Sequence, residues 1–322
     1  MGRNFKEYLL QVTKSSSCEE IEIIQSLWSG YGRISRYQLD NIPTKTVVIK
    51  HISLNEVDKH PRGWNTTNSH NRKVRSYEVE TCWYEKWSHD CSENCKVPIL
   101  IGTWSQDKDQ WIILEDLKTI FPLRKYDLEI REVNVCLKWL ANFHATFMEI
   151  EPKGLWKVGT YWHLQTRPDE FEKIENEELK SKAHLIDEKL NNCKHQTIVH
   201  GDAKLANFCF SADGKKVAAV DFQYVGGGCG VKDVAYFLGS CLSSSECERY
   251  QEQLLDFYFK ELKTALGNIN SNIDFSILEN EWRKMYPIAC TDFIRFLQGW
   301  MPTHQKINKY NLTLMTKVLG SL

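Results

Sequence analysis

The residues that are able to do chemistry gather in one stretch of the sequence, from His200 to Asp221. Its first part, HGDAKLAN, places Asp202 directly after a strand-like apolar run, and Asn207 follows five positions later. In phosphoryl transfer a carboxylate orients the attacking hydroxyl group, and oxygen ligands hold magnesium on the nucleotide phosphates. We therefore predict that Asp202 is a catalytic base.

A hairpin is predicted directly after this loop. Two apolar runs flank an Asp213-Gly214 turn, and Asn207 and Asp221 each lie seven positions from Gly214. Residues opposite each other on paired strands have Cβ atoms roughly 4.5–5.5 Å apart, so an amide oxygen and a carboxylate there can share one hard cation. The symmetry predicts a magnesium site at Asn207 and Asp221, although each residue alone is more simply explained as the polar end of a buried strand.

Three other residues have more than one interpretation. Lys204 stands two positions after Asp202, where an ammonium group can neutralise the moving phosphoryl group, and a solvated surface lysine explains it equally well. His200 is better explained as a buried residue that orients the loop than as a chemical participant. Asp233 begins a helical pattern, and we expect it to cap that helix or to brace the catalytic loop.

The first part of the chain, predicted to be residues 1–117, has the pattern of a sheet. Apolar or β-branched runs bounded by turn formers occur at 27–39, 44–54 and 109–117, which indicates antiparallel strands. Within 74–87, apolar side chains recur every four residues. This spacing predicts one main helix packed on the sheet.

The second part, predicted to be residues 118–322, has a different pattern. Long amphipathic stretches occur at 129–150 and 169–192, which predicts a mostly helical unit with the catalytic hairpin as its exception. No repeat or low-complexity linker separates the two parts, so the boundary near Leu117 is predicted to be a hinge. The predicted fold class is therefore α+β, with two lobes.

Length, composition and charge limit the classes of protein. A chain of 322 residues with 42% hydrophobic and 26% charged residues can bury a core of two modest lobes. A net charge of -1 gives no overall attraction to nucleic acid or to an anionic membrane, and no stretch is predicted to span a membrane. Eleven cysteines and a polar beginning predict a reducing, cytoplasmic compartment. His89, Cys91 and Cys95 lack a second pair at zinc-like spacing, so free thiols are expected.

The pattern HGDxxxxN followed by an Asp-led strand end resembles the aminoglycoside phosphotransferase and choline kinase superfamily, relatives of protein kinases. The resemblance spans most of the chain. It is greatest to the ecdysteroid kinase-like branch, because of the SGYGRI loop, the EDL segment and the GGGxG run after DFQ. It implies a two-lobed protein-kinase-like fold, ATP and magnesium as cofactors, Asp202 as the base, and Asn207 and Asp221 as magnesium ligands.

The same resemblance assigns a nucleotide side. Gly30 and Gly32 would form the phosphate lid, where glycines let backbone N–H groups approach phosphate oxygens. Lys50 ends the apolar run TVVIK, where the family has a lysine that contacts the α and β phosphates. Glu115 and Leu117 would be hinge positions that bind adenine through the backbone, although solvation explains acids there equally well.

A buried Lys50 needs an anionic partner, and the predicted helix offers Glu78 or Glu80. Glu80 lies three and four positions before Trp83 and Tyr84, so it shares the apolar face of that helix. Glu78 does not share this spacing. We therefore predict that Glu80 is the partner of Lys50.

The substrate side is less defined by the sequence. Five aromatic residues near the end of the chain could cage an ammonium group, as in choline kinases: Trp282, Tyr286, Phe293, Phe296 and Trp300. The helical spacing of the last three favours a packed core instead. Residues 226–230 could form a substrate loop or a wide turn. The basic segment 60–76 could approach an anionic substrate or be a solvated loop.

Together these observations predict a small-molecule kinase that transfers the γ-phosphate of ATP to a hydroxyl group of a small metabolite. Its partners would be ATP and that substrate, without nucleic acid or membrane. The alternative from another class is a catalytically silent nucleotide-binding protein, a pseudokinase or scaffold with the same fold. A protein side chain is a less favoured acceptor, because the chain lacks an activation-loop and APE-type segment.

Overall fold

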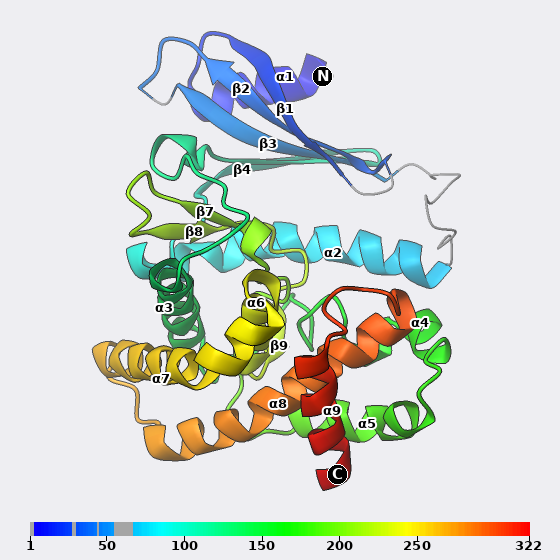
Figure 1. Cartoon of the computed structure of the whole chain (residues 1–322). Helices are drawn as coiled ribbons and strands as arrows, with labels where there is room; N and C mark the ends of the chain where they lie inside the picture. Colours follow the sequence, from blue (N-terminus) through cyan, green and yellow to red (C-terminus); the bar gives the residue numbers. More distant parts are fainter. Residues whose placement is uncertain (1–2, 28–29, 44, 55–66) are drawn as a thin grey trace. The chain divides into compact units, whose positions relative to one another are not determined.

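The computed structural model describes residues 3–27, 30–43, 45–54 and 67–322 (Figure 1). The chain divides into two compact units. The first consists of Met1–His89 and Val97–Ile120, and the second of Asp90–Lys96 and Phe121–Leu322. A sheet-containing unit followed by a mostly helical unit confirms the predicted α+β class.

The first unit contains a five-stranded antiparallel sheet with the order β1-β2-β3-β5-β4. Its strands are β1 Cys18–Ser26, β2 Gly32–Leu39, β3 Thr46–Ser53, β4 Leu100–Gln106 and β5 Asp109–Glu115. The three predicted strands form its centre. The two edge strands, β1 and β4, were not predicted, because edge strands bury fewer side chains and carry a weaker apolar alternation.

One face of this sheet is covered by the helix α1 Arg3–Thr13, which was also not predicted (Figure 1). The Phe5 ring stacks on Trp111 at a centroid distance of 4.6 Å. Phe5 and Leu9 join Val47, Ile49 and other sheet residues in a buried cluster. Burial of these apolar groups holds the helix on the sheet.

The predicted helix of the first unit is α2 Thr67–Lys86. It begins earlier than its apolar pattern indicates, so the expectation of a loop at 60–76 is wrong for residues 67–76. The rest of that segment lies outside the described residues. Glu80, Trp83 and Tyr84 are buried, as their shared face predicts.

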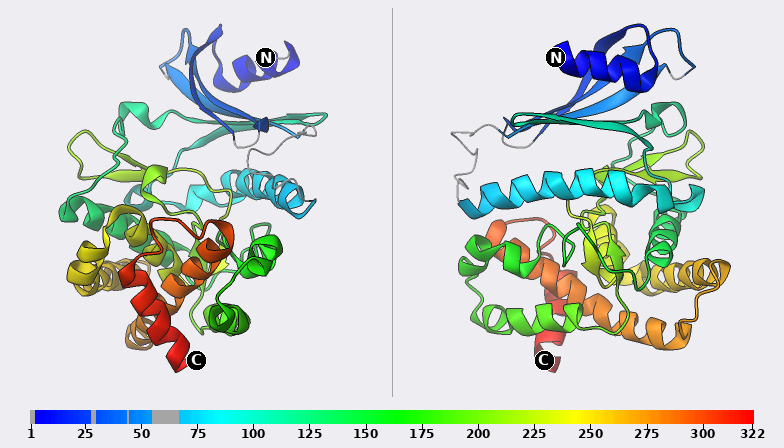
Figure 2. Two further views of the ribbon diagram at one scale, coloured as in Figure 1. Left: turned by 45° about the vertical axis from the view of Figure 1, so that its right-hand side comes forward. Right: turned by 180° about the vertical axis from the view of Figure 1, so that it is seen from behind.

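Seven α-helices are described in the second unit: α3 Ile130–Thr146, α4 Pro168–Glu172, α5 Glu177–Asn191, α6 Val231–Cys241, α7 Ser244–Asn268, α8 Phe275–Trp300 and α9 Lys309–Ser321. The long helix α8, orange in the figures, packs against α5, α6 and α9, while α7 packs against α3 (Figure 2). The stretch predicted as one helix at 169–192 is two, because Asn176 caps a new start by accepting a hydrogen bond from the backbone N–H of Leu179.

Short elements complete the chain. The 3-10 helices are η2 Ser88–Asp90, η3 Glu93–Cys95, η4 Leu117–Thr119, η5 Leu164–Thr166 and η6 Leu205–Asn207. Two short antiparallel pairs in the second unit carry the candidate site: β6 Thr197–Val199 with β9 Gly226–Gly228, and β7 Phe208–Phe210 with β8 Val217–Ala219. No helix among the described residues is long and apolar enough to cross a membrane.

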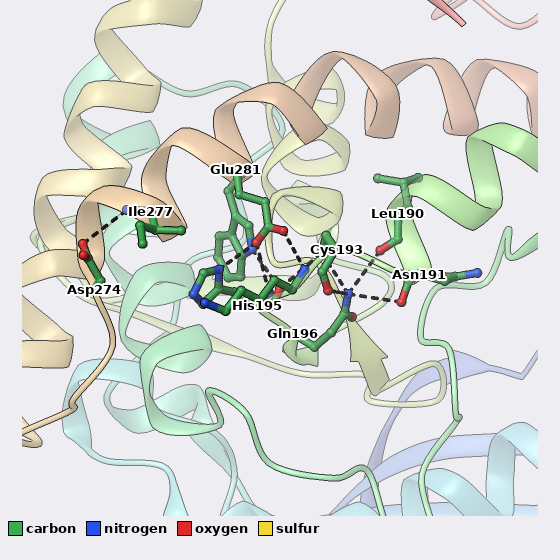
Figure 3. Close-up of polar contacts among 10 residues, drawn as sticks. Leu190, Asn191, Cys193, His195, Gln196, Asp274, Ile277 and Glu281 are labelled. Atoms are coloured by element: carbon green, nitrogen blue, oxygen red, sulfur yellow. Dashed lines mark hydrogen bonds and ion pairs between the residues drawn. The ribbon is translucent and has the colours of Figure 1, made fainter.

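The segment that leads into β6 is fixed by the helix α8 (Figure 3). The Glu281 carboxylate accepts hydrogen bonds from the backbone N–H groups of Lys194 (2.6 Å) and His195 (3.0 Å), and its Oε2 lies 2.7 Å from His195 Nδ1. Trp282 Nε1 donates to the carbonyl oxygen of His195 at 3.0 Å. Burial opposes ionisation of Glu281, but these hydrogen bonds lower its pKa. The strand before the catalytic loop therefore has a fixed start.

Candidate active site

The loop after β6 is held from behind by a buried carboxylate. Asp233 in α6 accepts hydrogen bonds from the backbone N–H groups of His200 (2.6 Å) and Gly201 (3.0 Å). Gly201 has a φ of +79°, and a Cβ there would lie 2.0 Å from the carbonyl oxygen of Tyr224. Only glycine fits this close approach. Of the two roles expected for Asp233, the structure shows the bracing of the loop.

His200 is fully buried and orients the next residue of the loop. Its Nδ1 accepts a hydrogen bond from the backbone N–H of Asp202 (3.2 Å), so the proton of the neutral ring is on Nε2. That nitrogen lies 3.1 Å from the carbonyl oxygen of Val220. The ring therefore joins the catalytic loop to the end of the hairpin, as expected for an orienting residue.

Asp202 is buried, and its two carboxylate oxygens differ. Oδ2 accepts hydrogen bonds from Lys204 Nζ (2.8 Å) and Asn207 Nδ2 (3.1 Å). Oδ1 is buried without a hydrogen-bond partner among the described residues. Burial raises the pKa of Asp202, the charge of Asp221 raises it further, and Lys204 opposes the rise. One oxygen is thus held in place while the other is able to accept a proton or a hydrogen bond from a ligand.

Lys204 is paired with the candidate base and is not an isolated surface lysine. Its side chain is 39% exposed, and its Nζ forms the 2.8 Å ion pair with Asp202. Burial favours its neutral form, but the negative charges of Asp202 and Asp221 raise its pKa above the ordinary value. The ammonium group therefore stays charged beside two carboxylates, where a phosphoryl group could also be neutralised.

The predicted register of the hairpin is wrong by one residue. Phe208 pairs with Ala219, and the backbone N–H of Val220 donates to the carbonyl oxygen of Asn207 at 3.0 Å. Asn207 is thus opposite Val220 and not opposite Asp221. The turn is centred between Asp213 and Gly214 rather than on Gly214, which shifts every pairing. Asp221 lies one residue beyond the position that faces Asn207.

Asp221 nevertheless lies close enough to Asp202 and Lys204 for its charge to raise both of their pKa values. Its backbone has a φ of 71°, in the left-handed region that costs a non-glycine residue about 1 kcal/mol or more. Its Oδ1 accepts a hydrogen bond from Gln223 Nε2 at 2.8 Å. Strain of this kind is concentrated at functional sites, where the surrounding structure maintains it.

The oxygen atoms around Asp202 suit magnesium. Asn207 uses its amide nitrogen for both side-chain hydrogen bonds that it makes with described residues, at 2.8 and 3.1 Å, so its amide oxygen is left for another ligand. With Asp221 this gives an amide oxygen and a carboxylate, the hard donors that magnesium prefers beside nucleotide phosphates. No group of three or more His, Cys, Asp or Glu side chains in the described part of the chain forms a metal cluster by itself.

A pocket of about 440 Å³ opens beside Asp202 within the second unit. Its lining combines aromatic rings with a few polar and charged groups: Tyr161, Asp202, Lys204, Leu205, Ala206, Tyr224, Tyr236, Ser240, Phe293, Trp300, His304 and Lys306. A mostly apolar cavity with few converging polar groups is the usual form of a small-molecule site. The pocket therefore places a substrate-sized space next to the candidate base.

The C-terminal aromatic residues divide between core and pocket. Trp282, Tyr286 and Phe296 are at most 3% exposed, which agrees with the packing that their spacing indicates. Phe293 and Trp300 line the pocket as well, on the same helix. Aromatic side chains of one helix can thus pack in the core and also line the pocket, because one edge of the helix reaches the cavity.

The glycine run after DFQ is a strand, not a flexible substrate loop. Gly226–Gly228 forms β9, and a Cβ on Gly226 would lie 2.2 Å from the carbonyl oxygen of Trp156. At Gly230 a Cβ would lie 2.5 Å from the ring of Trp282. These positions require glycine because backbone and aromatic atoms approach them closely.

In the first unit, the structure pairs Lys50 with Glu80. Lys50 Nζ lies 2.6 Å from Glu80 Oε2, and the two side chains are 4% and 2% exposed. Glu78 is exposed and pairs with Arg75 at 3.1 Å. A buried lysine is stable only with such a partner, and the helix face that Glu80 shares with Trp83 and Tyr84 is what favours Glu80 over Glu78 in the sequence.

The other predicted nucleotide residues have structural roles of their own. Gly30 and Gly32 have φ values of +78° and +129°, and a Cβ on Gly32 would lie 2.1 Å from the carbonyl oxygen of His51. Ser29, at the start of the SGYGRI loop, lies outside the described residues. Glu115 ends β5, and its Oε2 accepts a hydrogen bond from the backbone N–H of Ile99 at 3.1 Å. Leu117 is buried at the start of η4.

Several pocket residues are not evident from the sequence. Tyr161, Tyr236 and Lys306 come from three separate segments and meet only through the packing of the second unit. Lys306 lies in the polar stretch PTHQKINKY, which has no motif that marks it. The helical repeat of Tyr236 with its neighbours indicates burial, but not a cavity.

Comparisons with solved structures define the fold. The chain is similar to the microcompartment-associated aminopropanol kinase, with a TM-score of 0.53 and 13% identity over 99% of this chain and 95% of that one. It is also similar to a Plasmodium vivax ethanolamine kinase, with a TM-score of 0.52 and 12% identity over 95% of this chain and 84% of that one. Both similarities show that the chain shares the fold of these two proteins, and they confirm the predicted fold class.

Part of the second unit also matches a known family in sequence. Residues 157–271, which include the catalytic loop and hairpin, match the model of the ecdysteroid kinase-like family. None of the curated proteins matches the chain in sequence. The family match and the structural neighbours together confirm the resemblance that the HGDxxxxN pattern indicated.

Proposed function

We propose that this chain is an ATP-dependent phosphotransferase that transfers the γ-phosphate to a hydroxyl group of a small molecule. The observation that carries the proposal is the arrangement of Asp202. One of its oxygens is fixed by Lys204 and Asn207, and the other is buried beside a substrate-sized pocket without a partner among the described residues. A kinase fold around this geometry gives the carboxylate a definite use.

In the proposed reaction, the acceptor hydroxyl binds in the pocket and donates its hydrogen bond to Asp202 Oδ1. The carboxylate orients the hydroxyl oxygen toward the γ-phosphate and takes its proton as the bond to phosphorus forms. The proton affinity of Asp202 is increased by burial, which suits a base. Lys204 stabilises negative charge on the phosphoryl oxygens.

The nucleotide would be held by residues 1–117, and the catalytic and substrate sites by residues 118–322. We assign Lys50, oriented by Glu80, to the α and β phosphates. The backbone of Gly30 and Gly32 would cover the phosphates, and the hinge residues Glu115 and Leu117 would contact adenine. Magnesium, held by Asn207 and Asp221, would neutralise phosphate charge.

The proposal is tested by incubating the purified chain with magnesium, γ-labelled ATP and a metabolite extract. We expect label in a small-molecule product, and a fall of about 10²–10⁴-fold in Asp202→Asn, the range for removal of a general base. Asp213→Asn, which changes an exposed carboxylate in the hairpin turn, is the matched control and should keep full transfer.

Two results would contradict the proposal in different ways. Equal labelling by the wild type and Asp202→Asn would show that the base is misassigned. No labelled product, together with thermal stabilisation by magnesium and ATP, would favour the silent nucleotide-binding alternative.

A further inference from the structure

The acceptor pocket already contains a cation that belongs to the chain. Lys306 Nζ lies 4.8 Å from the ring centroid of Tyr236 and 5.3 Å from that of Phe293. Both rings line the pocket beside Asp202. Aromatic faces at this distance attract a positive charge. The surface that an ammonium-bearing substrate would use is therefore occupied by the ammonium group of Lys306.

Lys306 is held in this position by its backbone. It lies in the connection between α8 and α9, where its N–H donates to His304 Nδ1 (3.1 Å) and its carbonyl oxygen accepts from Asn311 Nδ2 (2.9 Å). The backbone N–H of Ile307 also donates to the carbonyl oxygen of His304 at 2.8 Å. These three hydrogen bonds fix the backbone on both sides of the residue, and the side chain extends from it over the rings of Tyr236 and Phe293.

Lys306 feels the negative charge of Asp202 but forms no ion pair with a carboxylate of the pocket lining. Asp202 is neutralised by Lys204 through the 2.8 Å ion pair. The Nδ1 atom of His304 accepts a hydrogen bond, and burial together with Lys306 lowers the pKa of this ring, so it is neutral at pH 7. Burial lowers the pKa of Lys306 to about 8, which still leaves it mainly protonated at pH 7. Among the residues that line the pocket, Lys204 and Lys306 carry two positive charges and Asp202 carries one negative charge, while Asp221, whose charge acts on Asp202 and Lys204, lies outside the lining.

The hydrogen-bond donors of Lys306 are not used by the protein. Its Nζ forms no hydrogen bond or ion pair with any residue of the described part of the chain, although the side chain is partly buried. A desolvated ammonium group without acceptors is unfavourable, and a ligand oxygen in the pocket would relieve this cost. The ammonium group of a bound ligand would instead be repelled by the positive charge of Lys306 beside the rings of Tyr236 and Phe293.

We propose that Lys306 is a specificity-determining residue that excludes positively charged alcohols from the acceptor pocket. It favours acceptors that carry an oxygen able to accept a hydrogen bond from its Nζ, either a neutral hydroxyl or a carboxylate. This inference rests on the proposed kinase function, because it takes the pocket beside Asp202 as the acceptor site. It separates this chain from kinases of amino alcohols, whose substrates carry an ammonium group.

The test compares four small alcohols for binding to the purified chain with magnesium and AMP-PNP, by ligand-detected NMR. Choline and its uncharged isostere 3,3-dimethylbutan-1-ol differ only in charge. The diol 1,4-butanediol and the anion 4-hydroxybutanoate test the two kinds of oxygen. We expect 3,3-dimethylbutan-1-ol to bind at least tenfold more tightly than choline, and one or both oxygen-bearing probes to bind more tightly still.

The variant Lys306→Met keeps the length and apolar stem of the side chain but removes its charge. We expect it to bind choline at least tenfold more tightly than the wild type does, to lose tenfold for whichever oxygen-bearing probe the wild type prefers, and to change less than threefold for 3,3-dimethylbutan-1-ol. Lys309→Met changes an exposed lysine at the start of α9 and should leave all four affinities unchanged. A thermal melt of each variant checks that the fold is intact.

The inference is overturned if the wild type binds choline as tightly as its uncharged isostere, or if Lys306→Met does not improve choline binding. Phosphate transfer from ATP to these alcohols is measured separately. Absence of a labelled product from the metabolite extract, with the charge preference intact, would contradict the proposed kinase function and leave the charge preference of the pocket standing. Transfer to choline as fast as to the neutral alcohols would contradict the inference and leave the kinase function standing.

Discussion

Asp233 is the residue whose replacement tests the architecture of the catalytic loop most severely. It is fully buried, and its carboxylate has three partners: the backbone N–H of His200 at 2.6 Å, the backbone N–H of Gly201 at 3.0 Å, and His144 Nε2 at 3.2 Å. The change Asp233→Asn keeps the shape of the side chain. It removes the charge and replaces one acceptor oxygen with an NH2 group.

The magnitude follows from these contacts. With the amide oxygen toward His200, the NH2 group faces the N–H of Gly201, and two donors then meet without an acceptor. In the flipped orientation the bond to His200 is lost instead. A lost charge-assisted hydrogen bond costs about 1.5–3 kcal/mol, and a buried unsatisfied N–H adds about 1–3 kcal/mol. We therefore expect Asp233→Asn to lower the free energy of unfolding by about 3–5 kcal/mol.

Urea unfolding followed by circular dichroism measures this loss. The matched control is Asp256→Asn, because Asp256 forms a 2.7 Å ion pair with Arg283 but has a side chain that is 69% exposed. Surface pairs of this kind contribute about 0–1 kcal/mol. A loss below about 1 kcal/mol for Asp233→Asn, equal to that of the control, would refute the bracing role.

Three further predictions concern other parts of the fold. Glu80→Gln should lower the free energy of unfolding by about 3–5 kcal/mol in urea titration, since it removes the carboxylate that lies 2.6 Å from the buried ammonium group of Lys50; a loss below about 1 kcal/mol, as for an exposed ion pair, would contradict this. Gly299→Ala should destabilise the chain, because its Cβ would lie 1.8 Å from a backbone carbonyl oxygen of α4, whereas Gly267→Ala has open space and should stabilise α7 by up to about 1 kcal/mol; equal melting shifts would contradict the packing. Hydrogen bonds lower the pKa of Glu281 against the effect of burial. The ionised carboxylate therefore stabilises the folded state above the pKa that Glu281 has in the unfolded chain, and this stabilisation is lost as the pH falls through the lower pKa of the folded state. As the pH is lowered, the free energy of unfolding measured in urea should therefore fall more steeply in the wild type than in Glu281→Gln. Parallel plots of this free energy against pH would contradict the prediction.

The features predicted correctly from the sequence are those that a single secondary-structure element determines. The choice of Glu80 over Glu78 needs only the face of a single helix, and the structure places Glu80 beside Lys50. The order of strand, loop and hairpin around Asp202 is also local. The register of that hairpin was missed, because the centre of the turn differs by half a residue from the symmetric position at Gly214 and this changes which residue faces Asn207.

The pocket could not be predicted, because it is formed by long-range packing. Tyr161 lies between helices, Phe293 in α8 and Lys306 after that helix, and no pattern in the sequence indicates that they meet. The helix α1 and the edge strands were missed for a related reason, since their apolar residues are few and become informative only against the rest of the sheet. Motifs therefore indicated the candidate catalytic residues, whereas the pocket beside Asp202 could be found only in the three-dimensional structure.

The central claim is that Asp202 orients and deprotonates an acceptor alcohol for transfer from ATP. The most direct measurement is the single-turnover rate of phosphate transfer to an identified acceptor, in the wild type and in Asp202→Asn, with magnesium and ATP saturating in both. We predict a rate about 10²–10⁴-fold lower in the variant with its ATP affinity unchanged. Equal rates in the two proteins would contradict the claim.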